Sequence, residues 1–445
     1  MPFKTLQVPQ AQQYWIRQAR IPACFLPEVP RGAASSDDGA LVDLLIDRES
    51  IAALEPSGGA ADAALPVLDL EARQVWPTLI DMHAHLDKGH IITRIENPDG
   101  SFAGARQATT DDRTQHWTAE DIRTRMNFAL RCAYVHGVAA IRTHLDSQEP
   151  DLAQRSWGVF REMREEWRGR ITLQAAALVP IDAFRTPYGA ALANLVAQSG
   201  GVLGGVTRAS GGVHSGLLED IDPLLDTILR LAAERELDVD LHVDESGDPE
   251  AAALERIAAA VLRNGFRGRV VCGHCCSLSV QPEAQRMRTI ALCAEAGVAV
   301  VTLPTVNLYL QDRAPGRTPR WRGVAPIQEM RRSGIPVAIG GDNCRDPFHA
   351  YGDHDMVDTF RHAVRIAHLD HPFGDVPALA GPVPAAIIGT APLGNIRVGG
   401  PARLILFSAR SLNELICRPQ ADRLVIDRGH QVAEELPDYA ELDRL

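Results

Sequence analysis

The sequence predicts an α/β protein, a (β/α)8 TIM-like barrel with a small β-sandwich formed by both chain ends. Eight apolar segments of strand length alternate with helical patterns between residues 76 and 394. Shorter, weakly alternating segments occupy 1–75 and 395–445. The chain of 445 residues also exceeds the size at which one hydrophobic core keeps growing, which indicates a large domain with a smaller companion.

The two chain ends have the patterning of a small β domain. Loops rich in Gly, Ser, Asp and Pro separate the strand-like segments 15–26, 40–54, 66–76, 401–409 and 422–433. We expect residues 1–75 and 395–445 to pack together into one sandwich. The barrel, residues 76–394, would then be inserted between them.

The central region reads as alternating strands and helices. Buried parallel strands are near-continuous apolar runs, and the candidates are 78–85, 139–146, 171–180, 202–209, 238–246, 269–274, 298–305 and 335–342. Helical periodicity marks 118–137, 221–237, 249–265 and 325–334. At the start of the first of these helices, Thr118 and Asp121 have the spacing of a capping box. Because the active site of such a barrel lies at the carboxyl ends of its strands, polar residues there are the candidates for function.

Composition limits the possible partners. The net charge is −12 and no Lys/Arg run occurs, which argues against nucleic acid and favours a small-molecule substrate. The eight Cys lie mostly in apolar segments, and the first residues lack the features of a signal peptide, so we expect reduced thiols in the cytoplasm. No run of about 18 apolar residues is present, so no membrane span is expected.

The first barrel strand ends in the richest polar cluster of the chain, within VWPTLIDMHAHLDKGH (75–90). Side chains two apart on a strand point the same way, so His83 and His85 share one face. A single His in a strand is commonly a hydrogen-bonded core residue. A His-x-His pair at the end of an apolar strand has the spacing to bind one divalent metal ion.

Three further strand ends carry residues of the same chemistry. His242 and Glu245 end the fifth strand, His274 ends the sixth, and Asp342 ends the eighth. In a closed barrel these termini converge, so we expect one metal site rather than separate buried histidines.

Several motifs occur in an order that resembles the amidohydrolase superfamily, and within it the cytosine deaminase branch. They are HAHLDKG (83–89), IRTHLD (141–146), LHVDES (241–246), GH (273–274), TVNLYLQDR (305–313) and GGDNCRDPFHAYGDHDM (340–356). The first and last are also similar to N-isopropylammelide amidohydrolase. The resemblance covers essentially the whole chain.

The resemblance implies a metal-dependent hydrolytic deaminase of an amino-substituted N-heterocycle. One divalent metal ion, Zn or Fe(II), would be held by His83, His85, His242 and Asp342, with Asp342 also taking up a proton. Glu245 would protonate the ring nitrogen, and His274 would orient the nucleophile or stabilise developing charge. A homo-oligomer is expected, since symmetric oligomers are the common kind.

Three positions depart from the cytosine deaminase pattern. Ile181 follows the Pro that ends strand three, where that branch has a Gln whose amide reads the pyrimidine edge. Asn343 replaces the second Asp of an Asp-Asp pair, and Phe348 replaces a Trp. The triazine relative, in turn, lacks the Glu of LHVDES. We therefore expect the substrate pocket to differ from that of cytosine deaminases and to bind another heterocycle. The candidates are a cytosine-like pyrimidine, a triazine and a bicyclic pterin.

Other candidates rest on position alone. Lys88 is expected either to contact substrate or to pair with a nearby Asp, and Asn307 and Gln311 are expected to line the pocket. The polar segment 97–116 suits a lid over the site or a passive surface loop equally. Two alternative functions stay open, an amidohydrolase that opens a cyclic amide and a non-catalytic barrel that binds a metal or another ligand.

Overall fold

The computed structural model describes residues 3–59 and 64–443, which contacts within the chain divide into two units. The first unit comprises the chain up to Ile80 together with 133–140 and 355–436. The second comprises 81–132, 141–354 and the residues from Pro437 onward. The domain boundaries expected from the sequence, 1–75 with 395–445 against 76–394, stay a prediction.

The first unit contains two β-sheets. One has the order β2-β3-β1-β5, with β4 also paired to β3, and the other has the order β17-β16-β15-β6. Antiparallel pairing of β6 with β15 joins Trp76 to Ile405, so both halves of the chain contribute to one sheet. The strands are β1 (Gln13–Ile21), β2 (Ser35–Ser36), β3 (Gly39–Asp47), β4 (Ser50–Pro56), β5 (Val67–Asp69), β6 (Val75–Pro77), β15 (Leu404–Leu406), β16 (Leu424–Asp427) and β17 (His430–Gln431).

Aromatic packing forms part of the core of this unit. The Trp76 ring lies with its centroid 5.2 Å from Phe25, 5.2 Å from Phe360 and 5.6 Å from Phe407. All four side chains are fully buried. The helices of the unit are α10 (Met356–Ala367), α11 (Pro382–Ile387) and α12 (Leu412–Cys417), with short 3₁₀ turns η1 (Phe3–Thr5), η2 (Ala23–Phe25) and η5 (Val376–Ala380).

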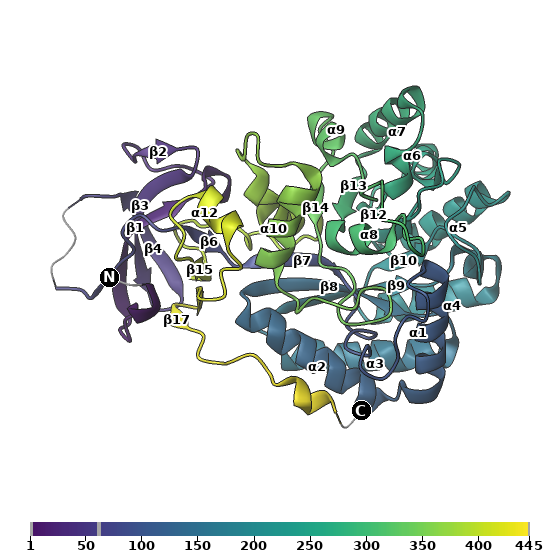
Figure 1. The fold of residues 1–445 in the computed structure, drawn as a ribbon, viewed down its shortest axis with the longest axis horizontal. Coiled ribbons are helices and arrows are strands. Elements are labelled where there is room, and N and C mark those ends of the chain that lie inside the picture. Colours follow the sequence, from purple (N-terminus) through teal and green to yellow (C-terminus); the bar gives the residue numbers. More distant parts are fainter. Residues whose placement is uncertain (1–2, 60–63, 444–445) are drawn as a thin grey trace. The chain divides into compact units, whose positions relative to one another are not determined.

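Eight strands run through the region predicted to be the barrel (Figure 1). Each lies inside, or within one residue of, a segment predicted from the sequence, which confirms the α/β alternation. They are β7 (Leu79–Ala84), β8 (Val138–Asp146), β9 (Thr172–Leu178), β10 (Leu203–Val206), β11 (Val239–Val243), β12 (Val270–His274), β13 (Ala299–Thr302) and β14 (Val337–Ile339).

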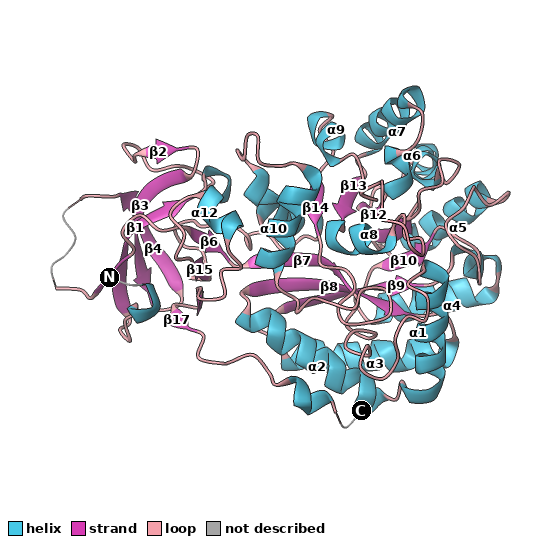
Figure 2. Ribbon diagram, viewed as in Figure 1, coloured by secondary structure: helices cyan, strands magenta, loops and turns pink. Residues whose placement is uncertain are grey.

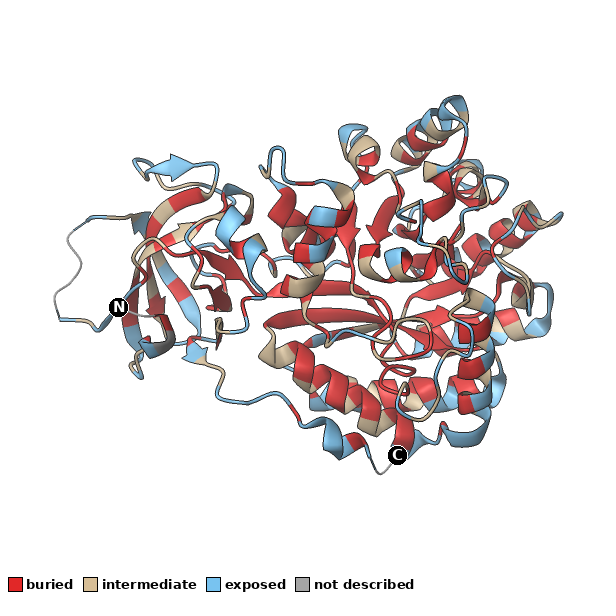
Figure 3. Cartoon of the chain, in the orientation of Figure 1, coloured by how far each residue is buried: buried red, intermediate tan, exposed pale blue. Residues whose placement is uncertain are grey.

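These strands pair in chain order. One sheet has the order β7-β8-β9, and a second, parallel sheet has the order β10-β11-β12-β13-β14. Two parallel bridges, Ala176–Val202 and Pro180–Val206, join the β9 segment to the β10 segment, and a third joins Ala84 to Asp342. Apart from exposed Thr172 and half-buried Gln174 in β9, the strands are buried on both faces, as Figure 3 shows for β8, because helices cover them.

Helices alternate with these strands and lie around them (Figure 2). They are α1 (Phe102–His116), α2 (Ala119–Val135), α3 (Pro150–Glu166), α4 (Pro187–Gln198), α5 (Ile221–Ala233), α6 (Ala253–Asn264), α7 (Glu283–Ala296), α8 (Pro304–Leu310) and α9 (Ile327–Arg332), with 3₁₀ turns η3 (Ile181–Arg185), η4 (Cys276–Ser279) and η6 (Tyr439–Leu442). Within the described residues, the structure has no helix with both the length and the apolar character needed to cross a bilayer.

The polar segment 97–116 is mostly helical. The Ser101 hydroxyl accepts a hydrogen bond from the Gly104 amide at 2.9 Å and caps α1. Small residues on one face of the helix, such as Ala105 and Ala108, are buried. Polar composition alone indicated a loop or lid, because the apolar stripe here consists of small side chains.

The capping box expected at the start of α2 forms only in part. The Asp121 amide donates to the Thr118 hydroxyl at 3.1 Å. The Asp121 carboxylate, however, pairs with Arg125 at 2.6 Å and with Arg94 at 2.6 Å. Arg125 is fully buried and donates to the backbone carbonyls of Asp87 and Gly89. The carboxylate of Asp121 therefore supports the loop that follows β7.

We expect Asp121→Asn to lower the free energy of unfolding by about 3 kcal/mol at neutral pH, because it leaves Arg125 buried without its anionic partner. Burial alone would raise the pKa of Asp121, but Arg94 and Arg125 outweigh it and lower that pKa. A lowered folded-state pKa contributes stability above the unfolded-state pKa of about 3.9, and this contribution disappears as the pH falls through the folded-state value. Urea unfolding at several pH values measures the effect.

The matched control is Asp111→Asn on α1, an exposed carboxylate, for which a change within about 0.5 kcal/mol is expected. The loss in Asp121→Asn should shrink toward the control as the pH drops below about 4. A loss that stays the same across this range would contradict the assigned ion pair.

Candidate active site

Four predicted metal ligands meet at the carboxyl ends of the strands. The Nε2 atom of His242 lies 3.1 Å from Nε2 of His83 and 3.3 Å from Nε2 of His85. One carboxylate oxygen of Asp342 lies 3.1 Å from Nε2 of His85 and 3.7 Å from Nε2 of His83. The structure thus brings together atoms from three separate parts of the sequence.

The backbone explains this convergence. His83 lies in β7 and His85 just beyond it, so the two-residue period of a strand puts both imidazoles on one side. His242 lies in β11, and Asp342 follows β14. The Asp81 carboxylate accepts hydrogen bonds from the amides of His83 at 3.2 Å and Gly341 at 2.9 Å, which ties the ends of β7 and β14 together.

The chemistry of this group fits a divalent metal ion. Burial lowers the pKa of His83, His85 and His242 well below the ordinary value, so the imidazoles are neutral, as metal ligation requires. Both carboxylate oxygens of Asp342 are buried and have no hydrogen-bond partner among the described residues. Ligands at about 2.0–2.1 Å from a tetrahedral zinc lie roughly 3.3–3.4 Å apart, which is close to the spacing observed here.

A proton-handling pair lies beside this group. Glu245 follows β11, and its Oε1 atom is 3.5 Å from Nδ1 of His274 at the end of β12. The Asn307 amide is 3.0 Å from the same Nδ1 atom and 3.5 Å from Oε1 of Glu245. Donation by Asn307 to Nδ1 assigns the proton of neutral His274 to Nε2, an atom that is buried with no partner among the described residues.

The environment of Glu245 favours its neutral form. Burial raises the pKa of this carboxyl group well above its ordinary value, and the charge of Asp342 raises it further. Lys88 and Arg208 act in the opposite direction. Burial also lowers the pKa of His274, to about 4. Glu245 can therefore hold a proton where an exposed Glu would have lost it.

Three other residues were predicted to belong to the site, and each makes a different contact. They are Gln311, Asn343 and Ile181. The Gln311 amide donates to the backbone carbonyl of Glu245 at 3.2 Å, so it positions that residue. Asn343 donates to the Asp346 carboxylate at 2.7 Å. Ile181 is fully buried in η3, and the cavity described next is lined by Pro180 rather than by Ile181.

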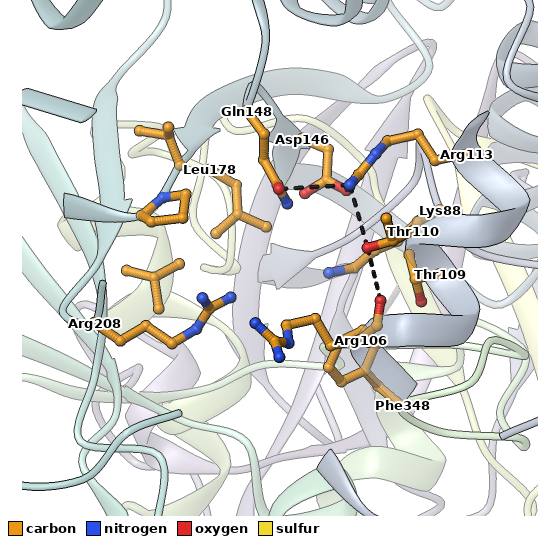
Figure 4. Close-up of a pocket in the computed structure, with 13 residues that line it drawn as sticks. Lys88, Arg106, Thr109, Thr110, Arg113, Asp146, Gln148, Leu178, Arg208 and Phe348 are labelled. Atoms are coloured by element: carbon orange, nitrogen blue, oxygen red, sulfur yellow. Dashed lines mark hydrogen bonds and ion pairs between the residues drawn. The ribbon is translucent and has the colours of Figure 1, made fainter. Parts of the chain in front are cut away.

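A cavity with about 380 Å³ of empty space, part of it open to solvent, is lined by α1 and by residues at or just after the ends of β7, β8, β9 and β10 (Figure 4). Its polar lining includes Lys88, Arg106 and Arg208, and Phe348 is on its wall. The Lys88 ammonium lies 4.8 Å from the centroid of the Phe348 ring. Neither Glu245 nor His274 is among the residues that line this cavity, but the charges of Lys88 and Arg208 both act to lower the pKa of Glu245.

Two arginines of this cavity were not predicted from the sequence. The side chains of Arg106 from α1 and Arg208 after β10 point toward one another in Figure 4. The Nε atoms of both are buried and have no hydrogen-bond partner among the described residues. Two cations arranged in this way fit a ligand with hydrogen-bond acceptors or negative charge. Arg208 lies near the end of the predicted strand 202–209, and a polar residue at that position could have been chosen as a candidate. Arg106 lies in the polar segment 97–116, for which no helix was predicted.

His144 is a further residue that the prediction left out. Its ring centroid is 3.9 Å from that of His83 and 4.7 Å from that of His242, and the side chain is fully buried. It lies near the end of β8, within the motif IRTHLD. The rule that found the other histidines, a polar residue near a strand terminus, also applies to this one.

The sequence of this chain is similar to those of known amidohydrolases and deaminases. A model of the amidohydrolase family matches residues 214–433. The chain is 48% identical over 444 residues to the pterin deaminase of Rhizobium rhizogenes, which covers 100% of this chain and 99% of that protein. It is 24% identical over 376 residues to the N-isopropylammelide isopropyl amidohydrolase of a Pseudomonas species, which covers 83% of this chain and 88% of that protein.

Solved structures share the fold. A 5-methylcytosine deaminase from Klebsiella pneumoniae liganded with 5-fluorocytosine has a TM-score of 0.80 at 21% identity, with 95% of this chain and 98% of that chain covered. The N-isopropylammelide isopropylaminohydrolase of Burkholderia multivorans has a TM-score of 0.74 at 23% identity, with the same coverage. The resemblance inferred from the motifs is thereby confirmed. The chain belongs to the amidohydrolase superfamily.

Proposed function

We propose that this protein deaminates a pterin by hydrolysis. The chain is a hydrolase that acts on carbon–nitrogen bonds other than peptide bonds, and it deaminates an amino-substituted N-heterocycle. The observation that favours a pterin is the 48% identity, over essentially the full length, to a protein named pterin deaminase. The buried Glu245–His274 pair beside the histidine group supports the same reaction, because deamination needs a proton donor at the ring.

The proposed metal ligands are His83, His85, His242 and Asp342, holding one divalent ion, zinc or ferrous iron. When bound, such an ion activates a water molecule as the nucleophile. Burial raises the pKa of Asp342, so this carboxylate is suited to accept the proton that the water loses.

Glu245 and His274 supply the remaining proton chemistry. In the proposed reaction the Glu245 carboxyl group donates a proton to the ring nitrogen next to the attacked carbon. The Nε2–H group of His274 donates a hydrogen bond to the oxygen that is added there. Asp342 passes its proton to the amino group, which leaves as ammonia, and the added hydroxyl group returns its proton to Glu245 as the carbon–oxygen bond becomes a carbonyl group. The net reaction consumes one water.

The cavity supplies contacts for the heterocycle. We assign Lys88, Arg106 and Arg208 as hydrogen-bond donors to its ring oxygen and nitrogen atoms, and Phe348 as a surface for the ring. Asn307, Gln311 and Asn343 would act by holding Glu245, His274 and the loop after β14 in position. Ile181 is proposed to affect the pocket only through neighbouring residues, because it is fully buried.

We further propose that the eight strands β7–β14 close into the (β/α)8 barrel and that the two sheets of the first unit form the β-sandwich. The bridges Ala176–Val202 and Ala84–Asp342 support closure, since each joins the end of one sheet to the other. The shared sheet of β6 and β15 supports a sandwich built from both halves of the chain. Closure would bring all the strand ends to one rim.

The test is ammonia release by metal-reconstituted protein from a panel of pterins, cytosine, isocytosine, 5-methylcytosine and aminotriazines. We expect release from pterins, and a loss of about 10²- to 10⁴-fold in kcat in Glu245→Gln, because glutamine cannot donate the proton. Metal content measured on the same samples shows that the variant keeps its ion.

The control is Glu250→Gln, an exposed carboxylate in the same loop after β11, which should keep the wild-type rate. Ammonia from another ring class but not from pterins would overturn the substrate assignment. If the metal-loaded protein released no ammonia from any compound on the panel, deamination would be ruled out, and hydrolytic opening of a cyclic amide would become the reaction to test.

Arg208→Met is expected to raise the KM for the pterin by about 10- to 100-fold, because a charge-assisted hydrogen bond contributes roughly 1.5–3 kcal/mol. Steady-state kinetics with the best substrate of the panel measures it. The matched variant is Arg230→Met on α5, where the side chain is 58% exposed and pairs with Glu234. Equal KM values for the two variants would remove Arg208 from the substrate site.

A further inference from the structure

We propose that the chain holds a second metal ion, coordinated by His90, Cys344 and His354, apart from the candidate active site. The ligand atoms of these three residues all lie within 4.8 Å of one another, and all three residues are buried. One thiolate and two imidazoles are a donor set that zinc prefers. The proposal is independent of the reaction assigned above.

The spacing of the two imidazoles repeats that of the first group. Nε2 of His90 lies 3.2 Å from Nε2 of His354, compared with 3.1 Å between His83 and His242. Two nitrogens bound to one tetrahedral zinc lie roughly 3.3–3.4 Å apart. The Cys344 side chain brings sulfur, which the first group lacks. The two sites would therefore differ in their preference for soft metals.

The local backbone is held in an uncommon conformation. His90 has φ 62° and His354 has φ 55°, both in the left-handed region, which a few per cent of non-glycine residues adopt and His adopts more often than most. Nδ1 of His90 is buried without a hydrogen-bond partner among the described residues. Such a conformation persists when the surrounding contacts determine it, and a shared metal ion would be one such contact.

The site would join two loops that carry active-site candidates. The His90 amide donates to the Cys344 carbonyl at 3.1 Å, and the Ile92 amide donates to the Arg345 carbonyl at 3.0 Å. The first loop carries Lys88, and the second begins just after Asp342. A metal ion here would fix these loops against each other at a distance from the reacting atoms, which is a structural role.

Aromatic residues pack beside the group. The Tyr439 hydroxyl donates to Asp353 at 2.9 Å, and its ring stacks on Phe128 with the centroids 5.6 Å apart. Phe128 in turn lies 4.9 Å from the ring of His90. Asp353 directly precedes His354 in the sequence, so this hydrogen bond ties η6 to the loop that carries two of the proposed ligands.

A hydrogen bond between two neutral imidazoles is the alternative explanation of the 3.2 Å distance. Cobalt substitution separates the two explanations. Of the two groups, the second contains the cysteine, so a thiolate-to-cobalt charge-transfer band in the near ultraviolet reports on that site alone. We expect this band in the Co²⁺-loaded protein and its loss in Cys344→Ser.

Two control variants test the assignment. Cys293→Ser removes a buried thiol of α7 that lies outside the group and should keep the band. His83→Ala removes a proposed ligand of the first site and should also keep the band, while losing activity. This contrast makes a failure of the second site distinguishable from a failure of the proposed function.

Metal analysis of zinc-loaded protein gives a second measure. We expect about two equivalents per chain in the wild type and about one in Cys344→Ser or His83→Ala. About one equivalent in the wild type, together with no sulfur–cobalt band, would overturn the proposal. These wild-type measurements decide the question even if a variant does not fold.

Discussion

Burial of three imidazoles and a carboxylate at contact distance is the constraint on which the rest of the structure depends. Among His83, His85, His242 and Asp342, four pairs of ligand atoms lie 3.1–3.7 Å apart, and all four side chains are buried. Polar groups packed so closely are stable only when neutral, hydrogen-bonded or bound to a cation. The surrounding strands hold the group in place, and Asp81 ties the ends of β7 and β14 together beneath it.

The electrostatics around this centre combine a proton donor with a cationic cavity. Glu245 is kept protonatable by burial and by the charge of Asp342. Lys88, Arg106 and Arg208 line the cavity, where Asp146 is the carboxylate among the lining residues. A neutral heterocycle with ring nitrogens and a carbonyl group suits these groups, since it can accept a proton from Glu245 and hydrogen bonds from the cations.

Strand positions and the candidate ligands could be predicted because both follow from local patterns. An apolar run of strand length ending in His, Glu or Asp places a polar side chain at a strand terminus, and this held for β7, β11, β12 and β14. Helix α1 was missed, because its buried face consists of small residues within a polar segment. The Asp121 capping box formed only in part, since buried Arg125 competes for the carboxylate.

The sequence by itself determined the alternation of strands and helices, the residue types at the strand ends and the superfamily. The two-residue period of a strand is a local property, so it needs no knowledge of the fold. Only the tertiary structure decided that Arg106 lies opposite Arg208 and that His90 meets Cys344 and His354. These placements join residues that are far apart in the sequence, and they depend on the conformations of loops. Long-range hydrogen bonds set those conformations, such as the bond from the His90 amide to the Cys344 carbonyl.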